Sequence, residues 1–141
     1  MDQIIDKTKP VMVTGASGYI ANWIVKLLLD AGCTVHATVR NPDNEKSVGP
    51  LKKIAAAAPQ GTLKLFKADL LDQGSFDAPM AGCEVVIHTA SPFVVRGFKS
   101  AQEALIRPAV EGTRNVLEAC NRTDSVKRVV LTSSVAAIYG D

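Results

Sequence analysis

The chain has 141 residues, a length that suits one domain with a hydrophobic core of its own. Hydrophobic residues make up 47% of the chain and charged residues 21%, which excludes an intrinsically disordered protein. The 16 basic and 14 acidic side chains leave a net charge of +2, so neither a nucleic acid nor a membrane surface is indicated as a partner.

The cysteine spacing and the N-terminal residues indicate the cellular compartment in which the protein is expected. Cys33, Cys83 and Cys120 are far apart, form no C-x-x-C pair and have no histidine cluster beside them. We therefore predict buried thiols rather than a disulfide framework or a metal site. Residues 1–7 lack the apolar core of a signal peptide, and no stretch approaches the roughly 18 apolar residues of a membrane span. We expect a soluble, cytoplasmic protein.

A glycine turn connects the first predicted strand with the first predicted helix. Residues 10–13 are short, apolar and β-branched, as in a buried parallel strand. Apolar residues then recur at helical spacing, at Ile20, Trp23, Ile24, Leu27, Leu28 and Ala31. Gly15 permits a sharp turn, Gly18 permits close approach of a ligand, and the free amides of the helix start attract an anion. The pattern predicts a pyrophosphate site, although an ordinary strand–turn–helix corner is the alternative.

Arg40 follows the second predicted strand, residues 34–39. In dinucleotide-binding folds the residue at this place faces the adenosine ribose, where an acid favours NAD and an arginine pairs with a 2′-phosphate. Arg40 therefore indicates NADP, with Lys46 as a weaker additional cation. A solvated surface arginine is the alternative.

Three further apolar runs predict strands at 62–66, 84–89 and 126–132. The segments between the strands are predicted as a loop at 41–50, helices at 51–58 and 72–81, a loop at 93–99 and a long helix at 100–121. A capping box at Ser100–Glu103 starts the long helix, and Pro108 is expected to kink it. The apolar face of this helix is expected at Leu105, Ala109, Val110, Thr113, Val116, Leu117 and Cys120.

Alternating strands and crossovers predict an α/β fold, a doubly wound parallel sheet of the Rossmann type with strand order 3-2-1-4-5. A ligand then binds at the carboxyl ends of the strands, where the order reverses between the first and fourth strands. The chemistry-bearing segments that fall on this edge are the glycine turn, Arg40, Asp69, Thr89–Ser91 and Ser133–Ser134. His88 also ends a strand, but a lone buried histidine is more often structural than catalytic.

Six segments carry a family resemblance by their order and spacing: Val13–Ile20, Ala37–Arg40, Lys67–Leu70, Val86–Pro92, Pro108–Thr113 and Leu131–Ser134. Over residues 10–140 the chain resembles the N-terminal part of the extended short-chain dehydrogenase/reductase family. Within that family it is most similar to the dihydroflavonol 4-reductase and cinnamoyl-CoA reductase group. The resemblance implies an NADP-dependent carbonyl reductase that acts on a small-molecule ketone or aldehyde.

The resemblance also implies a role for each matching residue. Those that would hold the cofactor are Ser17, Gly18, Tyr19 and Ile20 at the pyrophosphate turn, Arg40 at the 2′-phosphate, Asp69 and Leu70 at the adenine, and Thr89, Ala90, Ser91 and Ser133 along the cofactor. Ser134 is implied as the catalytic serine, whose hydroxyl hydrogen-bonds the substrate oxygen. Without the family pattern, a serine that caps a turn at the strand end is an equal interpretation.

Two departures from the family pattern limit what the resemblance implies. Ala21 stands where a third glycine is usual, which affects only local packing. The family's Tyr-x-x-x-Lys pair is absent, because neither Tyr19 nor Tyr139 is followed by a lysine four residues later. We therefore expect residues 1–141 to be a single dinucleotide-binding domain, the N-terminal part of a longer reductase without its substrate lobe, and inactive alone. An NAD-dependent nucleotide-sugar epimerase or dehydratase of the same family and a non-catalytic nucleotide-binding module are the alternatives.

Overall fold

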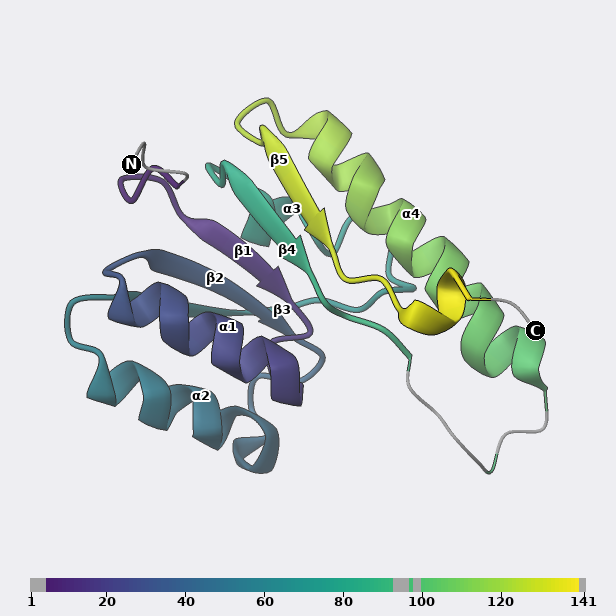
Figure 1. The fold of residues 1–141 in the computed structure, drawn as a ribbon, viewed down its shortest axis with the longest axis horizontal. Coiled ribbons are helices and arrows are strands. Elements are labelled where there is room, and N and C mark those ends of the chain that lie inside the picture. The colour runs from purple at the N-terminus through teal and green to yellow at the C-terminus, as the bar shows by residue number, and fades with distance from the viewer. Residues whose placement is uncertain (1–4, 93–96, 98–99, 140–141) are drawn as a thin grey trace.

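A five-stranded parallel sheet forms the centre of the molecule in the computed structural model, which describes residues 5–92, 97 and 100–139. Its strands are β1 (Val11–Thr14), β2 (Thr34–Val39), β3 (Thr62–Lys67), β4 (Val85–His88) and β5 (Arg128–Leu131). They are ordered β3-β2-β1-β4-β5, and every neighbouring pair runs parallel (Figure 1). The predicted doubly wound Rossmann-type sheet and its strand order are confirmed.

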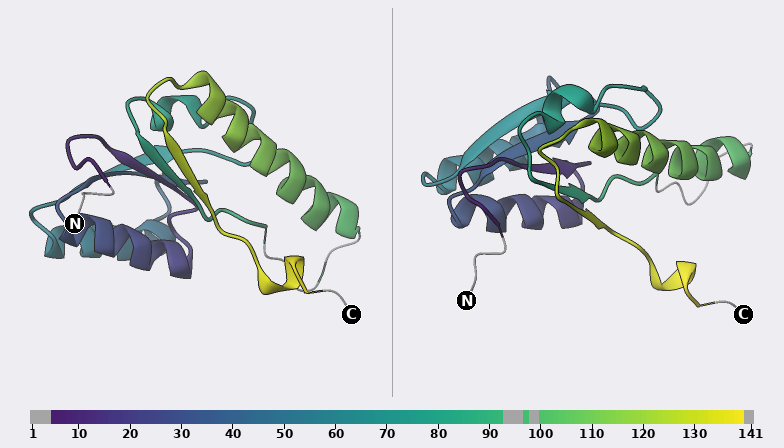
Figure 2. Two further views of the ribbon diagram at one scale, coloured as in Figure 1. Left: turned by 45° about the horizontal axis from the view of Figure 1, so that its top comes forward. Right: turned by 90° about the horizontal axis from the view of Figure 1, so that it is seen from above.

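Helices cover both faces of this sheet. Helices α1 (Tyr19–Asp30) and α2 (Glu45–Ala57) lie on one face, and α3 (Asp77–Met80) and α4 (Arg107–Arg122) lie on the other (Figure 2). The side chains of β1 alternate between the two cores that result. Val11 and Val13 pack among residues of α1 and α2, whereas Met12 packs with α3 and α4.

The buried face of α1 is not the one that the apolar spacing predicted. Its buried residues are Ala21, Val25, Leu28 and Leu29. Of the predicted set only Leu28 is buried, while Trp23 and Leu27 are 54% and 65% exposed. Ala21, at 2% exposure, fits tightly against the sheet, so the alanine in the third glycine position is accommodated in the core.

Helix α2 overturns the prediction of a loop at 41–50. The helix begins at Glu45, where the Asn44 side chain accepts a hydrogen bond from the Lys46 N–H, and it continues through Pro50. Val48 and Leu51 are fully buried against the sheet on either side of that proline. Their burial outweighs the missing backbone donor of Pro50, the last residue of the segment predicted as a loop.

Other elements are shorter than predicted. The helix expected at 72–81 is reduced to Asp77–Met80, because turns centred on Asp69–Asp72 and Asp72–Ser75 occupy its first part. The fourth and fifth strands lose one or more residues at each end, and they span Val85–His88 and Arg128–Leu131. Residues 93–96, 98 and 99 of the predicted 93–99 loop lie outside the described residues.

The long helix before β5 is distorted ahead of Pro108. Residues Gln102–Ile106 form a π-helical segment, in which the Arg107 N–H donates to the carbonyl of Gln102, five residues back. Pro108 then lies in the first turn of α4, where no backbone donor is required. The expected capping box is not among the described contacts of this turn, in which Ser100 uses its carbonyl to accept from the Ala104 N–H at 3.1 Å.

The apolar face predicted for this long helix is only partly correct. The buried residues of α4 are Gly112, Val116, Ala119 and Cys120. Val110 and Leu117, which were predicted on the apolar face, are 52% and 39% exposed. After β5 the chain leaves the sheet and forms a 3₁₀ turn at Val135–Ala137 that stands apart from the rest (Figure 2).

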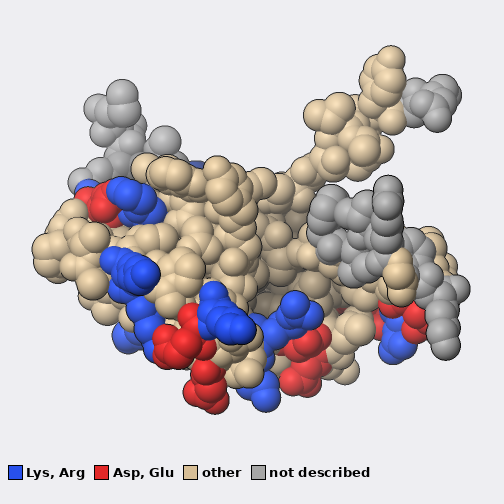
Figure 3. Space-filling view, turned by 90° about the horizontal axis from the view of Figure 1, so that it is seen from below, with Lys and Arg blue, Asp and Glu red and all other residues tan. Residues whose placement is uncertain are grey.

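Cys33, Cys83 and Cys120 are buried free thiols, as predicted, and burial raises the pKa of Cys83 to about 12. Within the described ranges, no helix has both the length and the apolar character needed to cross a bilayer. Lys, Arg, Asp and Glu side chains are interspersed along the lower border of the face shown in Figure 3. Neither sign of charge therefore dominates that border.

Candidate functional site

A cavity of about 560 Å³ opens at the carboxyl ends of β1, β2 and β4, where the strand order reverses. Its volume lies in the usual range of small-molecule sites. The predicted site residues that line it are Gly15, Ser17, Gly18, Arg40, Asp69, Leu70, Thr89, Ala90 and Ser91. The structure thus brings residues from four separate segments of the chain to one place.

The glycine turn lines this cavity with Gly15, Ser17 and Gly18. Gly15 has a φ of +62°, in the left-handed region, and a Cβ at this position would lie 2.9 Å from the Ala90 Cα. Both observations require glycine, because a side chain would strain the backbone and collide with the end of β4. The turn is closed by a hydrogen bond from the Gly18 N–H to the Gly15 carbonyl at 2.9 Å.

The amino end of α1 is open toward an anion. Gly18 occupies the N-cap position, and in the part of the chain that the structure describes no side chain caps the helix start. Asn22 instead donates its side-chain amide to the carbonyls of Ala16 and Gly18, at 2.9 and 2.8 Å, and so fixes the shape of the turn. The first amides of the helix and its dipole remain available for a negatively charged group.

Arg40 connects the main cavity with a smaller polar one. The second cavity has a volume of about 310 Å³ and is lined by Ser17, Arg40, Asn41, Asn44 and Ser47. Ser17 and Arg40 line both cavities. Among the six ion pairs formed by the described residues, none includes Arg40. Arg40 therefore lines a space among hydroxyl and amide side chains that suits an anion.

Lys46 does not join Arg40 in these cavities. It is exposed on the first turn of α2, and its backbone N–H donates to the Asn44 side chain at 3.2 Å. Lys46 lines neither cavity.

The turn at Asp69 and Leu70 lines the same cavity as the glycine turn. The Asp69 carboxylate accepts from the Leu71 N–H at 2.9 Å. Helix α4 holds the next residue in place, since Asn115 donates to the Leu70 carbonyl at 2.7 Å. A Cβ on Gly112 would lie 2.7 Å from the Leu70 Cβ, so only glycine lets this turn approach α4 so closely.

The end of β4 is tied to the end of β1 by hydrogen bonds. The Thr14 hydroxyl oxygen accepts from the N–H groups of Thr89 and Ala90, at 3.1 and 3.0 Å, and lies 2.7 Å from His88 Nδ1. His88 is 2% exposed, and its burial lowers the pKa of the imidazole. Its position agrees with the structural role that the sequence favoured over a catalytic one.

Besides Lys46, four predicted site residues lie outside both cavities: Tyr19, Ile20, Ser133 and Ser134. Tyr19 and Ile20 are the first two residues of α1, and their side chains are exposed. Ser134 is exposed and caps the turn at Val135–Ala137, accepting from the Ala136 N–H at 3.2 Å. This is the turn-capping arrangement that the sequence allowed as the alternative.

The sequence pattern of the NAD-dependent epimerase/dehydratase family matches residues 11–141. The chain belongs to this family. The match includes every strand of the sheet and every segment that lines the two cavities. The resemblance to extended short-chain dehydrogenases/reductases is thereby confirmed.

Similar members of the family include plant reductases. The chain is 55% identical to cinnamoyl-CoA reductase CAD2 of Medicago truncatula over 91% of its own length and 38% of that protein. It is 49% identical to a putative anthocyanidin reductase of Ginkgo biloba, over 94% of the chain and 38% of the relative. The structure of yeast methylglyoxal/isovaleraldehyde reductase Gre2 with NADPH superposes with a TM-score of 0.77, at 32% identity over 92% of the chain and 38% of Gre2. The chain thus spans less than two fifths of these relatives.

Some residues that line the two cavities were not predicted as site residues from the sequence. Asn44 and Ser47 were assigned to a loop, Phe76 fell within a predicted helix without a role of its own, and Pro108 was considered for a helix kink and as part of a family segment but not as cavity lining. Asn44 followed by Glu45 is a helix-start signal, and reading it would have placed Asn44 and Ser47 on the first turn of a helix that faces Arg40. No local signal marks Phe76, which reaches the cavity through the tertiary fold.

Proposed function

We propose that this chain is the cofactor-binding part of an NADP-dependent oxidoreductase that reduces a ketone or aldehyde carbon of a small molecule. The proposal is supported by a cavity at the carboxyl edge of the sheet and by similarity to proteins named as reductases. Since the chain spans 38% of those relatives, activity and substrate belong to the longer proteins and are proposed here by likeness.

The glycine turn fits the pyrophosphate of a dinucleotide. Gly15 leaves no room for a side chain between the turn and Ala90, and α1 presents amides that no side chain caps. A pyrophosphate supplies the negative charge and the acceptor oxygens that such a helix start binds. The chain's own backbone, rather than a cationic side chain, would hold this group.

The position of Arg40 is the single observation that favours NADP over NAD. Arg40 lines both cavities, and the smaller one adds the Ser17 hydroxyl and the side-chain amide of Asn44, while the Ser47 hydroxyl already donates to the Asn44 carbonyl. A 2′-phosphate offers oxygens for a forked arginine contact and for these neutral donors. A carboxylate that could accept from a ribose 2′-hydroxyl is not among the residues that line the smaller cavity.

NADPH, when bound, supplies the hydride for the carbonyl carbon, and the residues of this chain orient it. Asp69 and Leu70 would contact the adenine, and Thr89, Ala90 and Ser91 would line the middle of the cofactor. Ser134 is proposed as the group that steadies the substrate oxygen. Because its oxygen accepts from the Ala136 N–H, its hydroxyl proton remains free to donate to that oxygen.

A second candidate is an NAD-dependent epimerase or dehydratase. The description of the matching family itself favours it. The two candidates differ in what Arg40 does, because an NAD enzyme gains nothing from a cation at the 2′-position.

Replacing Arg40 tests the proposal. We expect Arg40→Ala to weaken NADPH binding by about tenfold or more, the loss typical of one charge-assisted contact to phosphate, and to leave NADH binding unchanged. Isothermal titration of the 141-residue chain measures both affinities. Lys53→Ala is the matched control, since Lys53 is an exposed cation of α2 that lines neither cavity. Equal losses in the two variants, or an equal loss of NADPH and NADH binding in Arg40→Ala, would contradict the assignment.

A further inference from the structure

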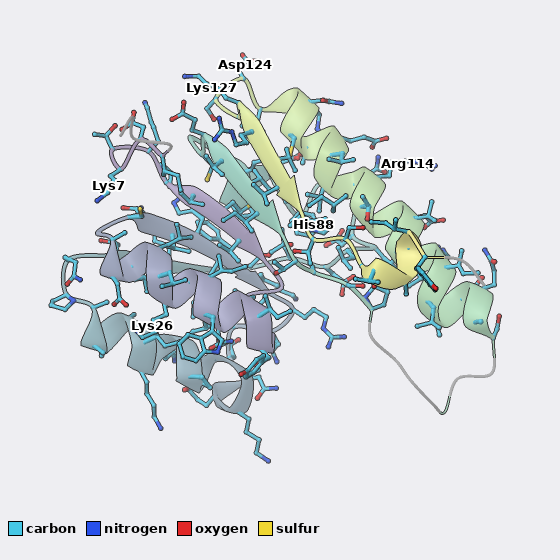
Figure 4. The ribbon with its side chains drawn as sticks, in the orientation of Figure 1. Lys7, Lys26, His88, Arg114, Asp124 and Lys127 are labelled. Atoms are coloured by element: carbon cyan, nitrogen blue, oxygen red, sulfur yellow. The ribbon has the colours of Figure 1, made fainter. Side chains whose placement is uncertain are left out.

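A buried hydrogen-bond cluster joins the last residue of β1 to the end of β4. Thr14 is fully buried, and its hydroxyl oxygen lies 2.7 Å from His88 Nδ1. The same oxygen accepts from the N–H groups of Thr89 and Ala90 at 3.1 and 3.0 Å. The Thr89 hydroxyl donates to the Thr14 carbonyl at 2.5 Å. Figure 4 shows His88 at the carboxyl end of β4, within the sheet.

The hydrogen-bond donors in this cluster determine the protonation state and the tautomer of the His88 imidazole. A backbone N–H only donates, so the amides of Thr89 and Ala90 occupy both lone pairs of the Thr14 hydroxyl oxygen. The hydroxyl proton is then left for His88 Nδ1, which must accept it. His88 is therefore neutral and carries its proton on Nε2. A proton on Nδ1 would leave the Thr14 hydroxyl surrounded by donors.

The cluster acts directly on the cavity. Thr89 and Ala90, which it fixes, line the cavity together with Gly15. Ala90 lies so close to Gly15 that a Cβ added to Gly15 would be 2.9 Å from the Ala90 Cα. A small shift of the β4 end would thus alter the shape of the glycine turn.

We propose that Thr14 and His88 form a positioning pair, in which a neutral His88 orients the Thr14 hydroxyl and so fixes the end of β4 against the glycine turn. The inference rests on the proposed binding of NADP, because that is the ligand assigned to the turn. His88 is a positioning residue and not a catalytic one, since it is 2% exposed and does not line either cavity.

The ring nitrogens can be observed directly in the unmodified 141-residue chain. ¹⁵N NMR of histidine-labelled protein distinguishes a protonated from an unprotonated ring nitrogen. We expect His88 Nδ1 to be an unprotonated acceptor and Nε2 to carry the proton at neutral pH. A protonated Nδ1 overturns the proposal, whatever the chain binds.

Two variants of His88 test the effect on binding. His88→Asn retains an acceptor oxygen near the position of Nδ1, whereas His88→Leu removes it. We expect His88→Leu to weaken NADPH binding by about tenfold, as loss of a buried acceptor does, and His88→Asn to stay within about threefold of the unmodified chain. Folded His88→Leu that binds NADPH as tightly as the unmodified chain overturns the proposal. If His88→Leu does not fold, the asparagine variant decides, because a tenfold loss there contradicts the acceptor role.

Binding of adenosine 2′-monophosphate distinguishes an effect of His88→Leu on the glycine turn alone from a general destabilisation of the fold. It carries the phosphate assigned to Arg40 and lacks the pyrophosphate assigned to the glycine turn. We expect its affinity, measured by NMR titration, to be the same in His88→Leu and in the unmodified chain. Equal losses for both ligands indicate general destabilisation and overturn the positioning role. If the unmodified chain binds neither ligand, the proposed function fails, and the ring-nitrogen measurement still decides the state of the pair.

Discussion

At the level of single residues, Arg40 and Lys46 show why nearby cations are not equivalent. Both follow β2 in the sequence, and both were predicted to bind the cofactor. Arg40 directly follows the last residue of the strand and lines both cavities, whereas Lys46 lies on the first turn of α2 and lines neither. Sequence spacing placed Arg40 because strand ends share one edge of the sheet. It did not place Lys46, because the direction of that side chain depends on a helix that was predicted as a loop.

His88 gives a prediction on stability at acidic pH. Burial lowers the pKa of His88 below its ordinary value of 6.5. As the pH falls below that value, the unfolded chain takes up a proton that the folded chain does not. Stability is therefore full above the unfolded pKa and declines below it, toward the folded pKa, by at most about 1.4 kcal/mol per pH unit. Urea unfolding at pH values between about 7.5 and about 5 measures this decline.

The asparagine variant is the control for this pH effect. His88→Asn has no titrating ring at this position, so we expect its stability to decline less over the same pH range. Identical pH dependence of the unmodified chain and of His88→Asn would show that His88 does not contribute.

At the level of secondary-structure elements, α1 shows what apolar spacing leaves undecided. Two overlapping sets of apolar residues both recur at helical intervals, and they differ by a rotation of the helix about its axis. One set contains Trp23 and Leu27, and the other contains Val25 and Leu29. The choice depends on how the helix leaves the glycine turn and lies on the sheet, which the sequence does not specify locally.

Two leucines of α1 test its observed orientation. Leu29 is fully buried and Leu27 is 65% exposed. We expect Leu29→Ala to lower the free energy of unfolding by about 2–5 kcal/mol, through lost burial and a cavity, and Leu27→Ala to lower it by less than about 1 kcal/mol. Denaturant unfolding of the two variants measures the difference, and a larger loss for Leu27→Ala would refute the orientation.

Helix α2 shows how burial overrides a local signal. Gly49 and Pro50 form a breaker pair in sequence terms, yet the helix runs from Glu45 to Ala57. Val48 and Leu51 flank the pair and are buried in the core beneath α1 and α2. The asparagine cap at residue 44 was the local feature that pointed to the correct start.

At the level of the whole molecule, the strand order and the position of the cavity were predictable from sequence. Short apolar runs alternating with crossovers specify a parallel sheet, and the glycine turn after the first run specifies where its order reverses. The placement of Ser133 and Ser134 was not predictable, because the chain leaves the sheet after β5 and no spacing rule governs its path. That residues 1–141 form a single dinucleotide-binding domain stays a prediction.

The central claim is that this chain prefers a cofactor with a 2′-phosphate. Titration of the unmodified 141-residue chain with NADPH and with NADH, under the same salt and pH, tests it most directly. Arg40 and the polar cavity beside it predict that NADPH binds more tightly, by about tenfold or more. Equal affinities, or tighter binding of NADH, would contradict the claim.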